Sequence, residues 1–274
     1  MENKNIIVTG GTDGIGLAIV KNLLKENNKI FIIGNNTQKG EKILKSLNSN
    51  SVEFLKCNLL ERDEIDKLSK KLSKLKKIDR LINNAGALFL KREENSLGIE
   101  KTFALNHLSY FQLSLSLLEK IESSQDGRII NVASNAHKRF DLDINDLENK
   151  NNYNSWKAYC RSKLLNILFT YTFNKKINTK VTCNCMHPGF VNSNFGNNNK
   201  SILRYAINLL KETLAISTHK GSLTAVYLCN SKDLIGISGK YFYKCKQRSS
   251  SNLSYDMNLA NLIWEESLKY IKVN

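Results

Sequence analysis

The sequence predicts an α/β fold, a single domain in which a doubly wound parallel sheet is flanked by helices. Short runs rich in β-branched residues alternate with longer helical patterns, which is typical of βαβ units. A glycine-rich turn follows the first of these runs. No internal repeat and no glycine- or proline-rich linker divides the 274 residues, so one domain over 1–274 is expected.

The alternation gives seven expected strands and seven expected helices. Two stretches between them look irregular, 135–155 and the asparagine-rich 192–200. Both follow strands at the carboxyl edge of the sheet, where open α/β sheets bind ligands. The expected strands are 5–9, 30–34, 52–54, 80–83, 128–133, 181–186 and 240–243. The expected helices lie near 15–27, 38–48, 62–76, 98–121, 156–175, 217–229 and 257–271.

The composition fits a soluble chain with one continuous core. Hydrophobic residues make up 41% of the sequence, and no run approaches the roughly 18 consecutive apolar residues of a transmembrane helix. The chain enters its first strand without the apolar leader of a secretory signal. A cytoplasmic location is therefore expected.

The six cysteines are expected to be reduced thiols. They form no Cys-x-x-Cys pair and have no histidine at metal-ligand spacing, so no metal site is predicted. Cys183 and Cys185 alternate with Thr182 and Asn184. This pattern favours two thiols on one face of a strand.

The net charge of +16 raises the question of a nucleic-acid or anionic-membrane partner. Lysine is spread along the chain among asparagines and does not gather with aromatic residues into a stripe. No nucleic-acid partner is expected. A general attraction for anionic cofactors and peripheral contact with lipid surfaces stay open.

A glycine-rich turn lies between the first expected strand and the first expected helix. Glycines allow a tight turn and close backbone approach, and a helix amino terminus offers free N–H groups and a positive dipole end to a pyrophosphate. A merely structural turn is the alternative, but this position favours a dinucleotide-binding, Rossmann-type domain. The cofactor-binding residues assigned here are Thr9, Gly10, Thr12, Asp13, Gly14, Ile15 and Gly16.

Two further signals point to chemistry. The quartet Asn83 to Gly86 ends the fourth expected strand, where small side chains let a ribose approach the backbone. Tyr159 and Lys163 stand four residues apart on an expected helix and therefore share a face. Alone, this pair also fits a helix with a packed ring and a solvated amine. Together with Ser134, which follows the strand 128–133, it indicates an active site.

A free phenol has a pKa of about 10, so an unperturbed tyrosine is protonated at neutral pH and is a poor base. A lysine ammonium one turn away, joined by a positively charged oxidised nicotinamide, favours the phenolate. We therefore expect the pKa of Tyr159 to be lowered.

These elements, in this order and spacing, resemble the short-chain dehydrogenase/reductase family over essentially the whole chain. The stretches NVASNAH at 131–137, AYCRSKL at 158–164, HPG at 187–189 and SGKYF at 238–242 are similar to its retinol-dehydrogenase-like branch. The resemblance implies that Tyr159 passes the proton, that Lys163 binds the nicotinamide ribose and that Ser134 holds the substrate oxygen. It also implies that Asn106 supports a proton-relay water, although ordinary helical burial would explain Asn106 as well.

The same resemblance assigns further cofactor contacts. Ser193 stands where the family usually has threonine, and Asn58 replaces an aspartate that contacts the adenine. The Asn58 amide can still donate and accept hydrogen bonds. The positions assigned are Asn35, Asn58, Leu59, Asn84, Ala85, Gly86, Pro188, Gly189, Val191 and Ser193, together with Tyr159 and Lys163.

The choice between NADP and NAD rests on the end of the second strand. Enzymes selecting NAD usually place an acid there, and this chain has Asn35 and Asn36, with Lys39 nearby. Asp13 in the glycine turn opposes a 2′-phosphate, but one solvated carboxylate is partly screened. NADP(H) is predicted, with NAD(H) as the alternative.

The predicted function is hydride transfer between the nicotinamide and a carbonyl or alcohol. A substrate-covering segment is expected near 190–215, where apolar residues including Leu203 and Ile207 favour a lipophilic substrate such as a retinoid, steroid or fatty aldehyde. An amphipathic helix packed on the core is the alternative for that segment. The rival functions are a catalytically silent NAD(P)-binding sensor or scaffold and a membrane-surface or nucleic-acid binder.

Overall fold

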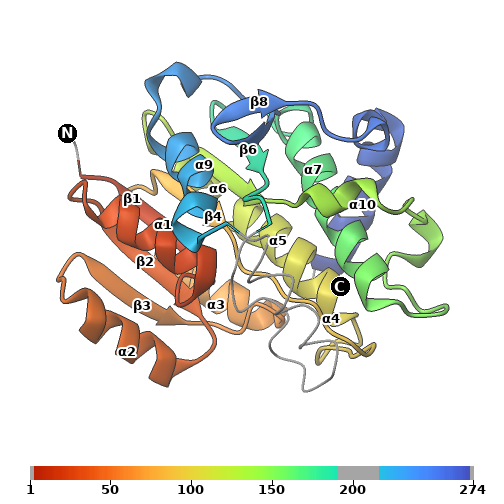
Figure 1. Cartoon of the computed structure of the whole chain (residues 1–274), viewed down its shortest axis with the longest axis horizontal. Helices are drawn as coiled ribbons and strands as arrows, with labels where there is room; N and C mark the ends of the chain where they lie inside the picture. Colours follow the sequence, from red (N-terminus) through yellow and green to blue (C-terminus); the bar gives the residue numbers. More distant parts are fainter. Residues whose placement is uncertain (1–2, 191–215, 272–274) are drawn as a thin grey trace.

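The sheet that organises the molecule has seven parallel strands and one antiparallel edge strand within the part of the chain described by the computed structural model, residues 3–190 and 216–271 (Figure 1). Its order is β3-β2-β1-β4-β5-β6-β7-β8, and only β7 and β8 pair antiparallel. The order reverses between β1 and β4, which creates the switch point where doubly wound sheets bind ligands. The strands are β1 Asn5–Thr9, β2 Lys29–Gly34, β3 Val52–Lys56, β4 Arg80–Asn83, β5 Arg128–Val132, β6 Thr182–Met186, β7 Tyr241–Tyr243 and β8 Lys246–Arg248.

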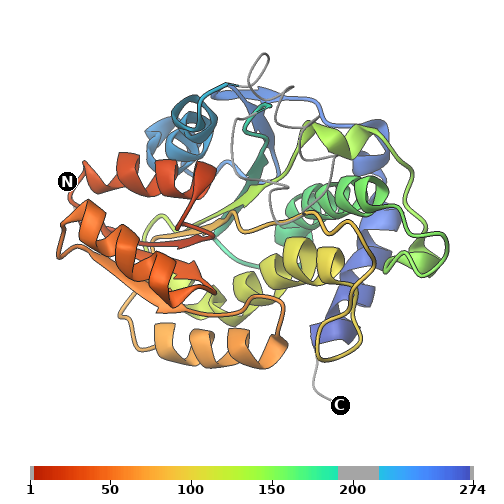
Figure 2. The same cartoon turned by 60° about the horizontal axis from the view of Figure 1, so that its bottom comes forward.

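Helices cover both faces of this sheet. Ile6 and Val8 of β1 pack with residues of α1 and α9, whereas Ile7 between them joins the core formed with α3, α5, α7 and α10. Figure 2 shows α1 and α9 on one side of the sheet and α3 on the other. Burial on both faces explains why the strands are continuous apolar runs. The longer helices are α1 Gly14–Leu24, α2 Thr37–Leu47, α3 Arg62–Leu72, α5 Ser109–Ser116, α7 Ser155–Lys176, α9 Thr218–Asn230 and α10 Met257–Ile271.

The predicted fold class is confirmed, and all seven predicted strands are present. Strand β8 was missed because its three residues are polar and exposed, so they carry no apolar pattern. It pairs with β7 across a turn in which Lys244 and Cys245 both have positive φ, 50° and 58°.

The single helix predicted near 98–121 is wrong in detail. The chain instead forms a short α4 (Lys101–Phe103), a π-helical turn η1 (Ala104–Leu108), α5, and a short α6 (Leu118–Glu122). Leu117, with φ −103° and ψ 2°, separates α5 from α6. The prediction rested on the spacing of apolar residues, which does not reveal where backbone hydrogen bonds change from the α-helical to the π-helical pattern.

The irregular stretch 135–155 contains two short 3-10 helices, η2 (Asn135–Lys138) and η3 (Ile144–Asp146). The substrate-covering segment predicted near 190–215 lies outside the described residues from 191 onward, and so does the stretch 192–200. The described residues on either side are adjacent, because the Ile216 N–H donates to the Phe190 carbonyl at 2.8 Å.

The six thiols are free, and Cys183 and Cys185 are fully buried on β6, as the alternating pattern predicted. Among residues 3–190 and 216–271, no helix combines the length and the hydropathy that crossing a membrane requires.

Candidate active site

The glycine-rich turn carries the chain from β1 into α1 at the carboxyl edge of the sheet. Gly10 and Gly14 have φ values of +64° and +53°, in the left-handed region that favours glycine. A Cβ on Gly10 would lie 2.9 Å from the Ala85 Cα, so β1 and β4 approach closely here. Asp13 caps α1, since its Oδ1 accepts from the Gly14 N–H at 2.7 Å.

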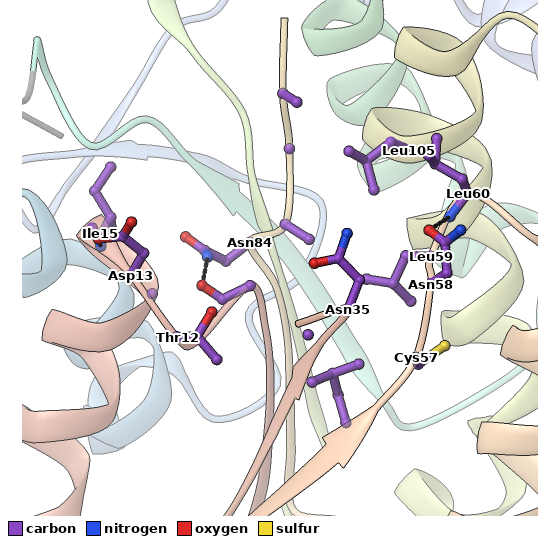
Figure 3. A pocket seen from close by; sticks show the side chains of 18 of the residues that line it. Thr12, Asp13, Ile15, Asn35, Cys57, Asn58, Leu59, Leu60, Asn84 and Leu105 are labelled. Carbon is purple, nitrogen blue, oxygen red and sulfur yellow. Dashed lines mark hydrogen bonds between the residues drawn. The ribbon is translucent and has the colours of Figure 1, made fainter. Parts of the chain in front are cut away.

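A cavity of about 380 Å³ opens over this turn. Figure 3 shows Thr12, Asp13 and Ile15 on one side of it, Asn58, Leu60 and Leu105 on the other, and Asn35 and Asn84 between them. Most of the predicted cofactor residues therefore share one cavity. Those that line it are Gly10, Thr12, Asp13, Gly14, Ile15, Gly16, Asn35, Asn58, Leu59, Asn84, Ala85 and Gly86.

Thr9 has a different place among the predicted residues. It is fully buried, and its hydroxyl accepts from the backbone N–H groups of Asn84 and Ala85 at 2.8 and 3.0 Å. The Asn84 side chain in turn donates to the Thr9 carbonyl at 2.9 Å. Thr9 thus holds the turn after β4 against the glycine turn, behind the cavity wall.

Asp13 and Lys39, whose charges bear in opposite ways on the predicted nucleotide preference, form an ion pair. The Nζ of Lys39 is 2.5 Å from Oδ2 of Asp13, and both side chains are exposed to solvent. Asn36 caps α2 by accepting from the Lys39 N–H at 2.9 Å, while the exposed Asn35 lines the cavity. Lys39 therefore offsets the negative charge of Asp13.

The far wall of the cavity is built by the loop after β3. Asn58 accepts from the Leu60 N–H at 3.3 Å through Oδ1, and its own N–H donates to Glu64 at 2.7 Å. Leu59 is buried beside it. These bonds fix the Asn58 side chain at the position where the family resemblance expects adenine.

The predicted catalytic residues come from the end of β5 and from α7. Ser134 follows β5, and its side chain is close enough to the Tyr159 hydroxyl to act on its pKa. Lys163 lies one turn further along α7, where Nζ donates to the Val132 carbonyl at 3.1 Å and sits 5.6 Å from the centroid of the Tyr159 ring. The structure therefore brings the three predicted residues together around the end of β5.

Burial sets the protonation of this cluster. It raises the pKa of Tyr159 to about 12, although the Ser134 hydrogen bond acts in the opposite sense, and it lowers the pKa of Lys163 to about 7. From the sequence, Lys163 and an oxidised nicotinamide were expected to lower the pKa of Tyr159. The protein side chains by themselves raise it. An amine that is itself desolvated gives the phenol little ammonium character to interact with.

Asn106 lies in the π-helical turn and is fully buried. Its Oδ1 accepts from the Ala87 N–H at 2.9 Å, and its Nδ2 donates to the Ala87 carbonyl at 3.0 Å and to the Ser162 hydroxyl at 3.0 Å. Asn106 thus joins the loop after β4 to the helix of Tyr159.

Gly86 connects the cavity to the catalytic cluster. A Cβ on this exposed glycine would lie 3.4 Å from Lys163 Nζ and 3.2 Å from Asn106 Oδ1. The glycine therefore leaves open the place where a dinucleotide crossing from the glycine turn would present its second ribose. This opening, with the amino-terminal residues of α1 lining the same cavity, fits a nicotinamide dinucleotide.

Pro188 and Gly189 follow β6 at the same edge. Gly189 has φ +90°, and a Cβ there would meet Ile216 Cδ1 at 2.9 Å. Its N–H donates to His187 Nδ1 at 3.1 Å. Val191 and Ser193 lie outside the described residues.

The sequence reasoning missed several residues of the site. Cys57, Leu60 and Leu105 line the cavity beside predicted neighbours, but their only signal is that adjacency. Trp156 stacks on Tyr159, with ring centroids 5.5 Å apart, and is 45% exposed. The available signal was a tryptophan three residues before the tyrosine on the same predicted helix.

Comparison with known proteins agrees with this geometry. Residues 4–202 match the family model described as short chain dehydrogenase. Human polyprenol dehydrogenase is 32% identical, over 95% of this chain and 83% of its own length. Human retinol dehydrogenase 14 is 30% identical, over 97% of this chain and 86% of its own length.

A solved structure of an uncharacterized protein from Mycobacterium Paratuberculosis superposes with a TM-score of 0.80 at 21% identity, covering 99% of this chain and 94% of the other. That likeness supports the fold. Because the family model and the curated relatives span most of the chain, this protein belongs to the short-chain dehydrogenase family, in its retinol-dehydrogenase-like branch, and is an NAD(P)-dependent oxidoreductase.

Proposed function

We propose that this protein reduces a lipophilic aldehyde or ketone to the alcohol with NADPH, and catalyses the reverse reaction when the alcohol and NADP are supplied. The observation that carries the proposal is the grouping of Ser134, Tyr159 and Lys163 around the end of β5, adjoining the dinucleotide cavity at Gly86.

The chemistry divides between the cofactor and the chain. When bound, the reduced nicotinamide supplies the hydride that adds to the carbonyl carbon. Tyr159 donates its phenolic proton to the carbonyl oxygen, and Ser134 donates a hydrogen bond to that oxygen as its negative charge develops. Because the pKa of Tyr159 is raised to about 12, the phenol is protonated at neutral pH and is ready to act as the acid.

The surroundings of Tyr159 support an apolar substrate. Leu88, Ala136 and Cys160 pack with the tyrosine in one buried cluster. Trp156 adds an exposed aromatic face next to its ring. Named relatives acting on polyprenol and retinol agree with this choice, since both are long apolar alcohols.

The proposed NADP(H) preference rests on the cavity wall near Asn35. A 2′-phosphate there would meet the Asn35 amide in place of an acid. Lys39 is nearby, since it pairs with Asp13, which lines the same cavity. The Lys39–Asp13 ion pair supports the preference because Asp13 does not stand as an uncompensated charge.

The first prediction tests the proposed function directly. Long-chain and short-chain aldehydes and alcohols are assayed by nicotinamide absorbance, with NADPH and NADH, in wild type and Tyr159→Phe. Catalytic efficiency should rise with substrate chain length in the wild type. The variant should lose at least about 100-fold in kcat because it lacks the exchangeable proton, while cofactor affinity stays within about twofold. Full activity in the variant, or cofactor binding without wild-type turnover of any substrate, contradicts the proposal.

A further inference from the structure

A buried histidine that is assigned no proton- or hydride-transfer step lies three residues after Ser134. His137 belongs to the short turn η2 and is 1% exposed. Its imidazole joins two segments that are far apart in the sequence, the turn after β5 and the loop after β8.

The partners of the two ring nitrogens determine the tautomer of His137. Nδ1 is 2.7 Å from the Ser134 carbonyl oxygen, which can only accept, so Nδ1 carries a hydrogen. Nε2 is 3.0 Å from the Ser251 backbone nitrogen, whose N–H can only donate, so Nε2 carries a lone pair. The ring is therefore neutral, with its proton on Nδ1. Burial favours the same state by lowering the pKa of His137.

The bond to Ser134 acts on a short and otherwise weakly held turn. Ser134 is extended, with φ −153° and ψ 152°, and its hydroxyl accepts from the Ala136 N–H at 3.2 Å. Its carbonyl also accepts from the His137 backbone N–H at 3.2 Å. The imidazole supplies the shortest of these bonds, so it restricts the rotation of the peptide that orients the serine hydroxyl.

The bond to Ser251 connects this turn to the helix of the catalytic tyrosine. The neighbouring Ser250 hydroxyl is 2.7 Å from the Tyr171 hydroxyl of α7 and 2.6 Å from the Ser254 hydroxyl. Tyr159 lies on the same helix. A closed path of contacts thus runs from Ser134 through His137 and the loop after β8 to α7, whose Tyr159 meets Ser134 again.

Aromatic packing fixes the ring plane of His137. Tyr241 of β7 packs against it in a T-shaped arrangement, with ring centroids 5.4 Å apart, and His187 stacks on the Tyr241 ring with centroids 5.9 Å apart. His187 immediately precedes Pro188 and Gly189. The same packed group therefore supports both the serine turn and the loop of the predicted cofactor contacts Pro188 and Gly189.

We propose that His137 is a positioning residue for hydride transfer, holding the Ser134 hydroxyl at its working distance from Tyr159 through an Nδ1–H bond to the Ser134 carbonyl and an Nε2 bond to Ser251. The assignment rests on the proposed function, because it gives the serine a role in turnover.

The test separates the two bonds by substitution. His137→Ala should lower kcat by about 10- to 100-fold, since small displacements of reacting groups cost this much, while the dissociation constant for NADPH stays within about twofold. His137→Asn keeps a donor for the Ser134 carbonyl and should recover kcat to within about fivefold of wild type. His137→Gln, which presents an acceptor toward Ser251 and loses the short donor, should remain impaired.

Gln112→Ala is the control, because it removes part-buried hydrogen bonds from α5 to Asp66 and the Arg62 carbonyl and leaves every bond of the path from Ser134 to α7 intact. It should lower the melting temperature as His137→Ala does, with kcat within about twofold of wild type. Equal losses of kcat in the two variants would show that His137 only stabilises the fold, and unchanged kcat in His137→Ala would also overturn the assignment.

A measurement that needs no turnover keeps this inference separate from the proposed function. Nitrogen-15 NMR of the wild-type protein at neutral pH should show His137 neutral with its proton on Nδ1. The cation or the Nε2–H form would overturn the inference even in an active enzyme. Absence of wild-type turnover with the correct tautomer would instead count against the proposed function.

Discussion

At the scale of single residues, the site contains two buried groups whose pKa values move in opposite directions from their ordinary ranges. The pKa of Tyr159 is raised to about 12 and the pKa of Lys163 is lowered to about 7, in both cases chiefly by desolvation. The phenol therefore keeps its proton, while the amine is held in a place that disfavours its charge. Active sites commonly carry such a stability penalty in exchange for function.

The second prediction concerns that penalty. The unfolded state binds more protons than the folded state between about pH 7 and pH 10.5, so Lys163 makes stability rise with pH across this window. Below pH 7 the full penalty remains. Lys163→Met should therefore raise the free energy of unfolding at pH 7 by ~2 to 4 kcal/mol and show little gain near pH 10.5.

Denaturant unfolding at several pH values measures this difference. Lys175→Met is the control, because Lys175 is an exposed lysine near the end of the same helix and should give no comparable gain. A Lys163→Met gain that does not change with pH would show that burial of charge is not its cause. The variant should lose activity, since it removes the donor that faces Val132.

The third prediction concerns Asn35 and the nucleotide. Asn35→Asp places an acid in the cavity wall, where it can accept from ribose hydroxyls and repel a 2′-phosphate. The ratio of catalytic efficiencies with NADPH and NADH should favour NADPH in the wild type and fall at least about tenfold in the variant.

Asn36→Asp provides the matched control for that ratio. Asn36 is the neighbouring amide, but it caps α2 and does not line the cavity, and aspartate is an equally good cap. Its ratio should stay close to wild type. A wild-type preference for NADH, or equal shifts in both variants, contradicts the role assigned to Asn35.

At the scale of secondary-structure elements, the π-helical turn η1 places Asn106 against the loop after β4. The widened turn lies next to α5, and both hydrogen-bonding groups of the Asn106 amide are used on Ala87. Single π-turns within helices often occur at functional sites. Here the turn couples α7, through Ser162, to the loop that carries Gly86.

The fourth prediction follows from these bonds. Asn106→Ala leaves buried Ala87 groups without partners, so the free energy of unfolding should fall by ~2 to 4 kcal/mol and kcat should fall as well. Gln112→Ala in α5 removes bonds to Asp66 and to the Arg62 carbonyl, away from the catalytic residues. This control should lose stability without a comparable loss of kcat. Equal kcat losses would assign Asn106 to folding alone.

At the scale of the whole molecule, the net charge of +16 sets the electrostatic environment of an anionic cofactor. A positive field attracts NADPH more strongly than NADH because the 2′-phosphate adds negative charge, and salt screens the attraction. The fifth prediction is that the KM for NADPH rises more steeply with salt concentration than the KM for NADH. Steady-state kinetics with a neutral substrate measures both, and identical slopes contradict it.

Several features of the whole molecule could be predicted from the sequence without the structure. The strand and helix alternation, the glycine turn and the positions of Ser134, Tyr159 and Lys163 were all predicted from local patterns. These features depend on short-range spacing, such as four residues along a helix or apolar runs buried on both faces of a sheet.

The tertiary structure decided the features that depend on contacts between distant segments. The Lys39–Asp13 pair, the bonds of Asn106 to Ala87 and the link from His137 to Ser251 join residues that no local pattern connects. The raised pKa of Tyr159 was likewise not predictable, because sequence spacing gives the proximity of Lys163 but not the burial of both groups. Desolvation and hydrogen-bond partners are properties of the packed chain, so they appear only when the elements are assembled.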